Sequence, residues 1–362
     1  MRTPALTAAT LEGIVTESTP FAGIDAVATD DIERLEGPVG VLGASGYVGG
    51  AAVAALEAAG VDVRPAAGSS HDRYPTVDVR DRTAVREFVE GCGCVVDAAG
   101  LVGIGTCADD PDAAFEINAL GSATVAWACR RRSVPLVHCS SAAAIGYPET
   151  LPVTAGHPRD PATTYGYTKL LGERAVRTVT DGSVPSITFV LTNPYGTVET
   201  VHGSAADGAS VVDFFLERAA AGNSLPVHRP GTQERDLIHV RDAARAVVAA
   251  VNALAGSTRT DSIDPRQGTD PRERTFVLGS GDSYSVLEVA GLVAAASTEL
   301  TGSSPDLELR TRPSDRPVID RFTVDPDPLE TALDVTPTVD LESWICGELE
   351  GRLERDRTSV RG

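Results

Sequence analysis

The sequence predicts an α/β protein in which a doubly wound parallel sheet is followed by a smaller C-terminal α/β lobe. From Pro38 to Asn193, short apolar runs alternate with stretches of helical pattern. Strands separated by helices of this length form right-handed βαβ units, which build a parallel sheet. After Asn193 the alternation loosens into short apolar pieces with many prolines, typical of a smaller lobe that caps a cleft. The 362 residues suffice for one large domain or two modest domains that share a ligand cleft.

Each expected strand is a short apolar run, and each expected helix is a longer stretch with a helical pattern of apolar residues. The expected strands are Val39–Leu42, Val61–Ala66, Thr76–Val79, Cys94–Asp97, Pro135–Cys139 and Ser186–Leu191. The expected helices between them are Tyr47–Ala59, Thr83–Glu90, Pro111–Arg131 and Tyr165–Val179. Beyond Asn193 we expect a helix at Val211–Ala221, a strand at Leu237–Val240 and a helix at Asp242–Leu254. Gly256–Arg274 is polar and rich in Gly, Pro and Asp, which predicts an exposed insertion.

The charge of the chain disfavours several classes of partner. Asp and Glu number 51 against 31 Lys and Arg, a net charge of −20 that disfavours binding to nucleic acid and anionic membranes. Lys169 is the one lysine among the basic residues. This composition favours adaptation to a high-salt cytoplasm, because hydrated carboxylates keep a surface soluble and salt screens their repulsion. Codon bias in a GC-rich genome also replaces Lys by Arg, but it does not by itself require so many acids.

Neither a membrane segment nor a leader peptide is expected. No stretch approaches the roughly 18 uninterrupted apolar residues of a membrane span, and the N-terminus lacks the apolar region of a secretory signal. We therefore expect a soluble, cytoplasmic protein. The six cysteines include no cluster with zinc-ligand spacing, so we expect reduced structural thiols and no metal site. Four histidines are expected to be structural or surface residues: His71, His138, His202 and His239.

A glycine-rich turn follows the first expected strand and opens the first expected helix. Its glycines, Gly43, Gly46 and Gly49, have the spacing G-x-x-G-x-x-G. Glycines here permit a tight turn and let a pyrophosphate approach the backbone at the helix N-terminus. Such turns also serve simply to pack a helix on a sheet, but the strand–turn–helix context favours a Rossmann-type, dinucleotide-binding domain.

A tyrosine and the single lysine share one face of the helix expected at Tyr165–Val179. Tyr165 and Lys169 are four residues apart, which places the ammonium beside the phenol. The positive charge lowers the pKa of the phenol toward working pH and makes it a usable acid or base. A chance pair on a solvated face is the alternative. The chain otherwise uses Arg, and a guanidinium does not mimic the compact ammonium, which favours chemistry at this pair.

Together these residues resemble the extended short-chain dehydrogenase/reductases of the NAD-dependent epimerase/dehydratase group, and especially their nucleotide-sugar 4-epimerases. The resemblance runs from about Val39 to about Trp344. Besides the glycine turn and the Tyr165–Lys169 pair, segments that match family motifs in order are Asp78-Val79-Arg80-Asp81, Asp97-Ala98-Ala99-Gly100, Asn118, Ser140-Ser141, Asn193-Pro194-Tyr195-Gly196, Arg235 to Val240, and Arg312-Pro313-Ser314-Asp315.

The resemblance implies a role for each matching residue. Tyr165 is the catalytic acid/base, Lys169 tunes it and holds the nicotinamide ribose, and Ser141 hydrogen-bonds the reacting hydroxyl or carbonyl. Ser140 is one residue early in the family register, and its alternative role is structural. Residues implied to bind the cofactor, NAD(P), are Gly43, Ser45, Gly46, Tyr47, Val48, Gly49, Ser69, Asp78, Val79, Ala98, Ala99, Gly100, Asn118, Tyr165 and Lys169. Residues implied to bind substrate are Ser141, Asn193, Arg235 and Arg312.

One departure from the family pattern concerns the choice of cofactor. Where the family carries an Asp for the adenosine ribose, at the end of the second strand, this chain has Ala67. Loss of the carboxylate favours NADP over NAD, because a carboxylate at this position repels the 2′-phosphate of NADP. The residues that follow are Gly68, Ser69, Ser70, His71 and Arg73. Ser and Arg can hold a phosphate, although they are also ordinary loop residues.

Two further departures concern the reaction. Dehydratases of the family follow the serine with Asp-Glu, the acid and base for water elimination, whereas Ala142 and Ala143 stand here and cannot move a proton. The arginine that often precedes the Asn-x-Tyr-Gly turn is missing from Phe189–Thr192. The sequence therefore predicts no 4,6-dehydratase activity.

The domain plan follows from the same resemblance. We expect an N-terminal arm to which we assign no function, packing or oligomerisation being the default, then a dinucleotide-binding domain, a discontinuous substrate-binding lobe and a tail. The arm is 1–37, the dinucleotide-binding domain 38–200 with 228–255 returning to it, the lobe 201–227 and 256–350, and the tail 351–362.

Three functions remain to be compared. A nucleotide-sugar epimerase, acting by hydride transfer at a carbinol carbon, is favoured by Arg235 and Arg312, which can clamp a diphosphate. The alternative is an NAD(P)-dependent dehydrogenase or reductase of a free sugar or other alcohol, which must exchange its cofactor. A non-catalytic dinucleotide-binding module is disfavoured by the joint presence of the three catalytic residues. The expected partners are a sugar or nucleotide-sugar substrate and a second copy in a homodimer, with no nucleic acid or membrane.

Overall fold

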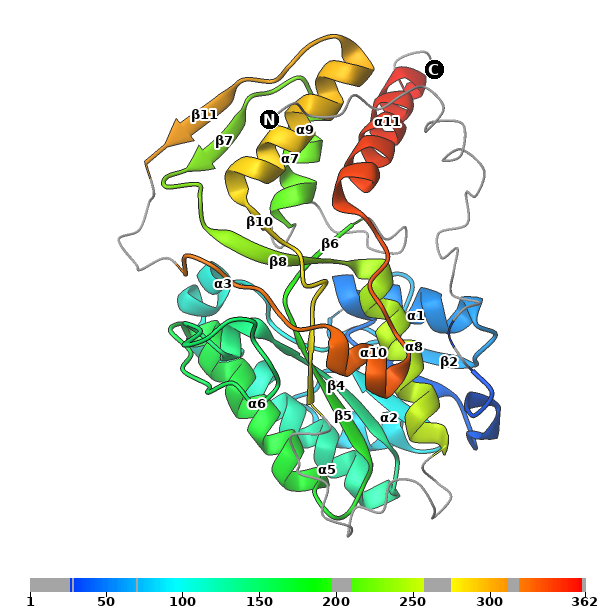
Figure 1. Ribbon diagram of the computed structural model, residues 1–362. Coiled ribbons are helices and arrows are strands. Elements are labelled where there is room, and N and C mark those ends of the chain that lie inside the picture. The colour runs from blue at the N-terminus through cyan, green and yellow to red at the C-terminus, as the bar shows by residue number, and fades with distance from the viewer. Residues whose placement is uncertain are drawn as a thin grey trace.

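The computed structural model describes residue 27 and residues 29–69, 71–196, 210–256, 275–311 and 319–359. Its larger unit is a six-stranded sheet with the strand order β2-β1-β3-β4-β5-β9, in which every neighbouring pair is parallel (Figure 1). The strands are β1 Val39–Leu42, β2 Val63–Ala66, β3 Cys94–Asp97, β4 Leu136–Ser141, β5 Ser186–Leu191 and β9 Thr275–Leu278. The order reverses between β1 and β3, and ligands of doubly wound sheets bind at the carboxyl ends of the strands at such a switch point.

Helices cover both faces of this sheet and bury a separate apolar core on each. On one face, α1 Tyr47–Ala58 packs beside α8 Val240–Gly256. On the other face lie α2 Arg82–Val89, α5 Ser122–Arg132 and α6 Thr164–Thr180. The connection from β3 to β4 begins with α3 Ile104–Asp109 and α4 Pro111–Ala114. The predicted Rossmann-type fold is confirmed.

A smaller unit sits above the carboxyl ends of the strands (Figure 1). It contains the mixed sheet β10-β8-β6 and the parallel pair β11-β7. Its strands are β6 Asn193–Tyr195, β7 Leu225–His228, β8 Glu234–His239, β10 Ser283–Ser285 and β11 Leu307–Arg310, and its helices are α7 Val211–Ala220, α9 Val286–Thr301 and α11 Leu341–Ser359. The three helices enclose a third core with β6, β7 and β8. The predicted α/β lobe is therefore present.

In the large unit one predicted element was wrong and another was modified. The strand expected at Thr76–Val79 is reduced to an isolated bridge between Thr76 and Ala67, because polar side chains turn the chain instead. Asp78 accepts the Arg80 N–H, and Asp81 caps α2 by accepting two N–H groups. The helix expected at 111–131 is interrupted by a π-helical turn, η4 Phe115–Gly121, which carries Asn118. Such turns occur frequently at functional sites.

The structure modifies the proposed boundaries of the lobe. Strand β9, inside the range 256–350, pairs with β5 in the large sheet, and α10 Asp327–Leu333 packs on α8. We therefore propose that both elements belong to the dinucleotide-binding unit. In the arm, the backbone N–H groups of Asp31 and Ile32 donate to the side chain of Asn252 on α8. The insertion at 257–274 lies outside the described residues, and none of the helices within them is long and apolar enough to cross a membrane.

Candidate functional site

The glycine turn after β1 packs directly on the turn after β3. Gly43 has φ +79°, and a Cβ there would lie 2.6 Å from the Ala98 carbonyl oxygen. A Cβ on Gly49 would lie 2.2 Å from the Gly43 carbonyl oxygen, so α1 also approaches the turn closely. Gly46, at the N-cap of α1, supplies no side-chain cap. The first N–H groups of α1 therefore point at the switch point without a capping side chain, an arrangement that suits a bound anion.

Asn118 ties the turn after β3 to α6. Its side chain is fully buried, accepts the Leu101 N–H at 2.8 Å and donates to the Leu101 carbonyl at 3.0 Å and to Thr168 Oγ1 at 3.1 Å. A Cβ on Gly100 would lie 3.1 Å from Asn118 Oδ1 and 3.6 Å from Lys169 Nζ. Asn118 and Lys169 thus both lie close to Gly100 of the turn after β3.

The first turn of α6 lies against the end of β4. Thr163 caps α6 by accepting the Gly166 N–H, and a Cβ on Gly166 would lie 2.2 Å from the Ala143 carbonyl oxygen. Tyr165 and Ser141 are both half-buried, and Ser141 Oγ accepts the Ala143 N–H at 3.2 Å. Lys169 is 6% exposed, and its ammonium donates to the Cys139 carbonyl at 2.7 Å. This bond fixes one of three ammonium protons and orients the lysine along the end of β4.

The end of β2 and the segment that follows it carry the remaining predicted cofactor residues. Ala67 is buried, and Ser69 is exposed with its carbonyl accepting Thr76 Oγ1. The Asp78 carboxylate receives the Arg80 guanidinium at 2.7 Å, which lowers the pKa of Asp78. Val79 is buried against Gly121 of the π-helical turn.

A buried ion pair that no sequence pattern indicated lies at α6 beyond Lys169. Glu173 lies one turn after Lys169 on α6, pairs with Arg159 at 3.2 Å and accepts Ser140 Oγ at 3.3 Å. The spacing of four residues from Lys169 was a usable signal for Glu173, whereas nothing local identifies Arg159 as its partner. This contact is of the kind that the structural alternative for Ser140 implies.

A second buried pair supports the turn after β3. His138 lies 3.1 Å from Asp97, both side chains being 1% exposed, and Asp97 also accepts the Ala99 N–H at 3.3 Å. Of the other histidines, His71 stacks on Tyr74 and His239 is buried in the lobe. His202 lies outside the described residues.

Two of the predicted substrate residues lie on the small sheet β10-β8-β6. The Asn193 amide donates to the Asp236 carbonyl at 2.9 Å and so joins β6 to β8. Arg235 Nη1 donates to the carbonyls of Glu234 and Ile319, both at 2.7 Å. Arg312 lies outside the described residues, so the predicted arginine clamp is described on one side alone.

A buried carboxylate, that of Asp236, accepts hydrogen bonds from several segments that join the two units. Asp236 is fully buried and accepts hydrogen bonds from the backbone N–H groups of Ser280 at 2.9 Å, Gly281 at 3.0 Å and Val324 at 3.2 Å. Thr192 Oγ1 donates to it at 3.3 Å. Burial raises the pKa of Asp236 to about 7, and the N–H donors oppose this rise.

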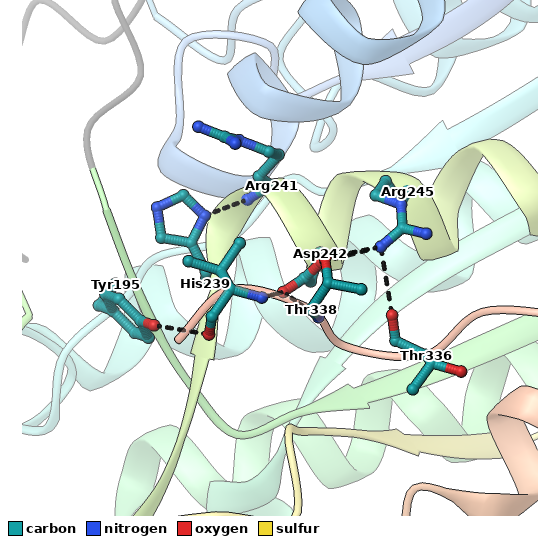
Figure 2. Close-up of polar contacts among 8 residues, drawn as sticks. Tyr195, His239, Arg241, Asp242, Arg245, Thr336 and Thr338 are labelled. Atoms are coloured by element: carbon teal, nitrogen blue, oxygen red, sulfur yellow. Dashed lines mark hydrogen bonds and ion pairs between the residues drawn. The ribbon is translucent and has the colours of Figure 1, made fainter. Parts of the chain in front are cut away.

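The start of α8 makes a further junction with the lobe (Figure 2). Asp242 pairs with Arg245 at 3.1 Å and accepts the N–H groups of Thr338 at 3.1 Å and of Val339 at 3.0 Å. The His239 ring packs edge-on to Tyr195, with ring centroids 5.1 Å apart, and burial lowers the pKa of His239 to about 3. This histidine is therefore neutral near pH 7.

Comparison with known proteins identifies the family. The model of the "NAD dependent epimerase/dehydratase family" matches residues 39–262, more than half of the chain. The chain belongs to this family. The matched range includes the glycine turn, Asn118, the Tyr165–Lys169 pair and Arg235, so the resemblance found in the sequence is confirmed, as is the expectation of an enzyme of the extended short-chain dehydrogenase/reductase type.

Relatives within the NAD-dependent epimerase/dehydratase family include sugar-nucleotide enzymes. The UDP-glucose 4-epimerase of Bacillus subtilis is 31% identical over 234 residues, which cover 59% of this chain and 63% of that protein. The UDP-glucose 4-epimerase of Corynebacterium glutamicum is 28% identical over 294 residues, 75% of this chain and 83% of that protein. The chain thus spans less than two thirds of the Bacillus relative.

Solved structures share the fold. The epimerase Mth375 of Methanothermobacter thermautotrophicus superposes with a TM-score of 0.74 at 22% identity, covering 95% of this chain and 98% of that one. The UDP-glucose 4-epimerase of Brucella ovis, in complex with NAD, gives a TM-score of 0.70 at 24% identity, covering 87% and 98%. Within the described residues, no group of three or more His, Cys, Asp or Glu side chains is arranged to hold a metal ion.

Proposed function

We propose that this protein is a nucleotide-sugar epimerase that acts by hydride transfer at a carbinol carbon. One observation carries the proposal: Lys169 lies beside Gly100 at the switch point. It belongs to the same helix as Tyr165, and the first turn of that helix packs on the end of β4. An acid/base and a dinucleotide turn at one place are what a reversible oxidation of an alcohol requires. UDP-glucose 4-epimerases among the relatives support the sugar-nucleotide class.

The residues present fit a nicotinamide dinucleotide. A Cβ on Gly43 would overlap the backbone after β3, and a Cβ on Gly49 would overlap the glycine turn, so both positions require glycine. The uncapped N-terminus of α1 suits the pyrophosphate. Lys169, Asn118 and the turn 98–100 would hold the nicotinamide half. When bound, such a cofactor would supply a reversible hydride acceptor, and epimerisation would require return of the hydride to the opposite face of the oxidised carbon.

Side chains of the protein transfer the proton of the reacting hydroxyl. Tyr165 takes the proton of the reacting hydroxyl and gives it back, while Ser141 hydrogen-bonds the same oxygen. Lys169 lies one turn further along the same helix, beside Gly100, where it would hold the cofactor. Ala142 and Ala143, which continue from Ser141, offer neither acid nor base, so the site does not support elimination of water.

A second candidate function rests on the end of β2. Ala67 carries no carboxylate there, and Ser69 is exposed beside it. We propose that this end admits the 2′-phosphate of NADP as well as NAD. A cofactor that exchanges freely suits a net dehydrogenase or reductase of a free sugar or other alcohol.

The two functions predict different products. We expect the enzyme, supplied with NAD or NADP, to interconvert a UDP-hexose with its 4-epimer and to give no 4-keto-6-deoxy product. Chromatography of the sugar nucleotides and absorbance at the reduced-nicotinamide band measure both reactions. Free pentoses and hexoses serve as the comparison substrates. Stoichiometric reduction of the cofactor by a free sugar, without interconversion of any UDP-sugar, would replace the epimerase by the dehydrogenase.

We also propose a homodimer formed through α5 and α6. These helices pack side by side. Large apolar side chains are exposed along η4, α5 and α6. Leu120 and Trp127 are seven residues apart on η4 and α5, and Tyr167 and Leu171 are four apart on α6, so each pair lies on one face. An exposed apolar patch of this kind marks an interaction site.

We expect the double variant Leu120→Glu/Leu171→Glu to sediment as a monomer where the wild type sediments as a dimer, because two charges per copy would be buried in the interface. Analytical ultracentrifugation measures the mass of each. The matched control is Leu309→Glu, since Leu309 is similarly exposed but lies on β11. A wild type that is monomeric, or a double variant that remains dimeric, contradicts this interface.

The net charge of −20 leads us to propose adaptation to high salt. The screening length falls from about 30 Å at 0.01 M salt to about 3 Å at 1 M, so repulsion among the carboxylates weakens. We expect the thermal midpoint to rise steadily as NaCl increases from dilute buffer to molar concentrations, measured by circular dichroism. A midpoint that does not change with salt would favour codon bias as the origin of the composition.

A further inference from the structure

The hydroxyl of Tyr47 joins the glycine turn to the substrate lobe. Tyr47 is the first residue of α1, and its hydroxyl lies 3.1 Å from Asp213 Oδ2 on α7. The same hydroxyl bonds the Gly196 carbonyl at the end of β6. One phenol thus contacts two lobe elements from the helix that opens the dinucleotide site.

The carboxylate that meets this phenol is built into the lobe. Asp213 is 8% exposed, and its Oδ2 also accepts Ser210 Oγ at 2.6 Å, while Ser210 caps α7. Arg352 of α11 lies 3.8 Å from the other carboxylate oxygen. Burial, followed by the charge of Asp213, raises the pKa of the Tyr47 phenol, which therefore remains a donor over the working pH range.

The main chain and the side chain of Tyr47 face different parts of the molecule. Its backbone N–H belongs to the uncapped first turn of α1, where the proposed function places the pyrophosphate. Its ring packs on the core between the large sheet and α1, and its hydroxyl reaches α7. A ligand that orders the first turn of α1 therefore restrains the phenol, and through it Asp213.

We propose that Tyr47 is a positioning residue that couples dinucleotide binding to the ordering of α7 in the substrate lobe. The inference rests on the proposed function in one respect, that a dinucleotide binds at the glycine turn. Because coupling between two sites is reciprocal, a substrate that orders α7 also tightens the dinucleotide. The free energy passes through the contacts of the Tyr47 hydroxyl with Asp213 and with the Gly196 carbonyl, and removal of the hydroxyl leaves the ring in place.

Hydrogen–deuterium exchange of the full chain, with and without saturating NAD or NADP, tests the coupling. In the wild type we expect dinucleotide to slow exchange about 10-fold both in the turn 43–49 and in α7. In Tyr47→Phe the turn remains protected, because the backbone is unchanged, whereas the slowing in α7 falls below about 2-fold. Asp213→Ala removes the other partner of the bond and is expected to behave in the same way.

Ser210→Ala is the matched control. It removes the cap of the same helix and one donor to the same carboxylate, but it leaves the Tyr47–Asp213 bond. We expect faster exchange in α7 of the free protein, with the slowing by dinucleotide retained. This control separates a general weakening of α7 from loss of the coupling.

The outcomes distinguish this inference from the proposed function. If neither dinucleotide protects the turn 43–49 in the wild type, the dinucleotide site is wrong, and the coupling that depends on it is overturned too. If the turn is protected but α7 is not, the coupling alone is overturned. Protection of α7 that persists in Tyr47→Phe and in Asp213→Ala also overturns it, whereas its loss in both, with Ser210→Ala unaffected, supports it.

Discussion

Replacing Tyr165 by Phe is expected to lower kcat by about 10²–10⁴, because removal of a general acid/base costs a rate factor of this size. The phenol ring is retained, so the packing of the first turn of α6 on the end of β4 is preserved. Lys169→Ala should lower kcat to a similar degree and should also weaken cofactor binding. Steady-state kinetics with the UDP-sugar identified by the product assay measure both effects, and circular dichroism checks the fold.

Tyr167→Phe is the matched control for this experiment. Tyr167 lies two residues further along α6, on a different side of the helix, and half of its side chain is exposed. This variant also removes a phenol hydroxyl, but on a different side of α6 from Tyr165. We therefore expect kcat close to that of the wild type. A Tyr165→Phe enzyme that turns over within tenfold of the wild type would end the assignment of Tyr165 as the acid/base.

Asp236→Ala is expected to destabilise the protein by about 3 kcal/mol or more, because it leaves several buried donors without an acceptor, each of which costs about 1–3 kcal/mol. The loss should depend on pH. Burial raises the pKa of Asp236 in the folded protein to about 7, above its unfolded value near 3.8. The protonated carboxyl therefore contributes most stability below about pH 4, and this contribution declines as the pH rises through about 7.

Urea unfolding of the wild type and of Asp236→Ala at pH 5 and at pH 8 measures this dependence. The difference in free energy of unfolding between the two proteins should be larger at pH 5. Comparing the two proteins cancels other titrating groups, such as His239. Asp282→Ala, which removes an exposed carboxylate near the same turn, should change stability by less than about 0.5 kcal/mol at either pH. An equal loss for Asp236→Ala at both pH values would contradict the raised pKa.

The fold was predictable where the signals are local. Strands β1, β3 and β5 begin and end at the predicted residues, because each is a short apolar run bounded by turn residues. The failures arose where side chains compete with the regular pattern. Asp78 and Asp81 turn the chain after Thr76 by accepting backbone N–H groups. Strand β9 was not predicted, since its four residues follow a long polar segment and gain their place only by pairing with β5.

The residues of the candidate site also fall into those that local spacing indicates and those that only long-range contacts bring together. The glycine turn and the Tyr165–Lys169 pair are set by spacing along one element, so the sequence alone indicates them. Glu173 and Arg159, or Asp236 and its donors, are contacts between distant parts of the chain, and no spacing predicts such partners. The cofactor residues assigned from the resemblance, and the substrate role of Arg235, remain predictions. The structure adds that Asn118 and Lys169 both lie close to Gly100.

The position of Asp236 has a consequence for how the two units can move and evolve. Three of its donors come from places where the backbone passes between the large sheet and the lobe: Thr192 after β5, Ser280 after β9, and Val324 ahead of α10. A fourth passage, from β8 to α8, begins three residues beyond Asp236 itself, and a fifth runs from α10 to α11. The lobe is therefore joined to the large sheet by several backbone segments and not by a single linker. If the backbone were cut at one passage, the lobe would stay attached through the others. Because the lobe is not one contiguous segment of sequence, it cannot be exchanged between proteins as a single insertion. New specificity must arise by substitution within it.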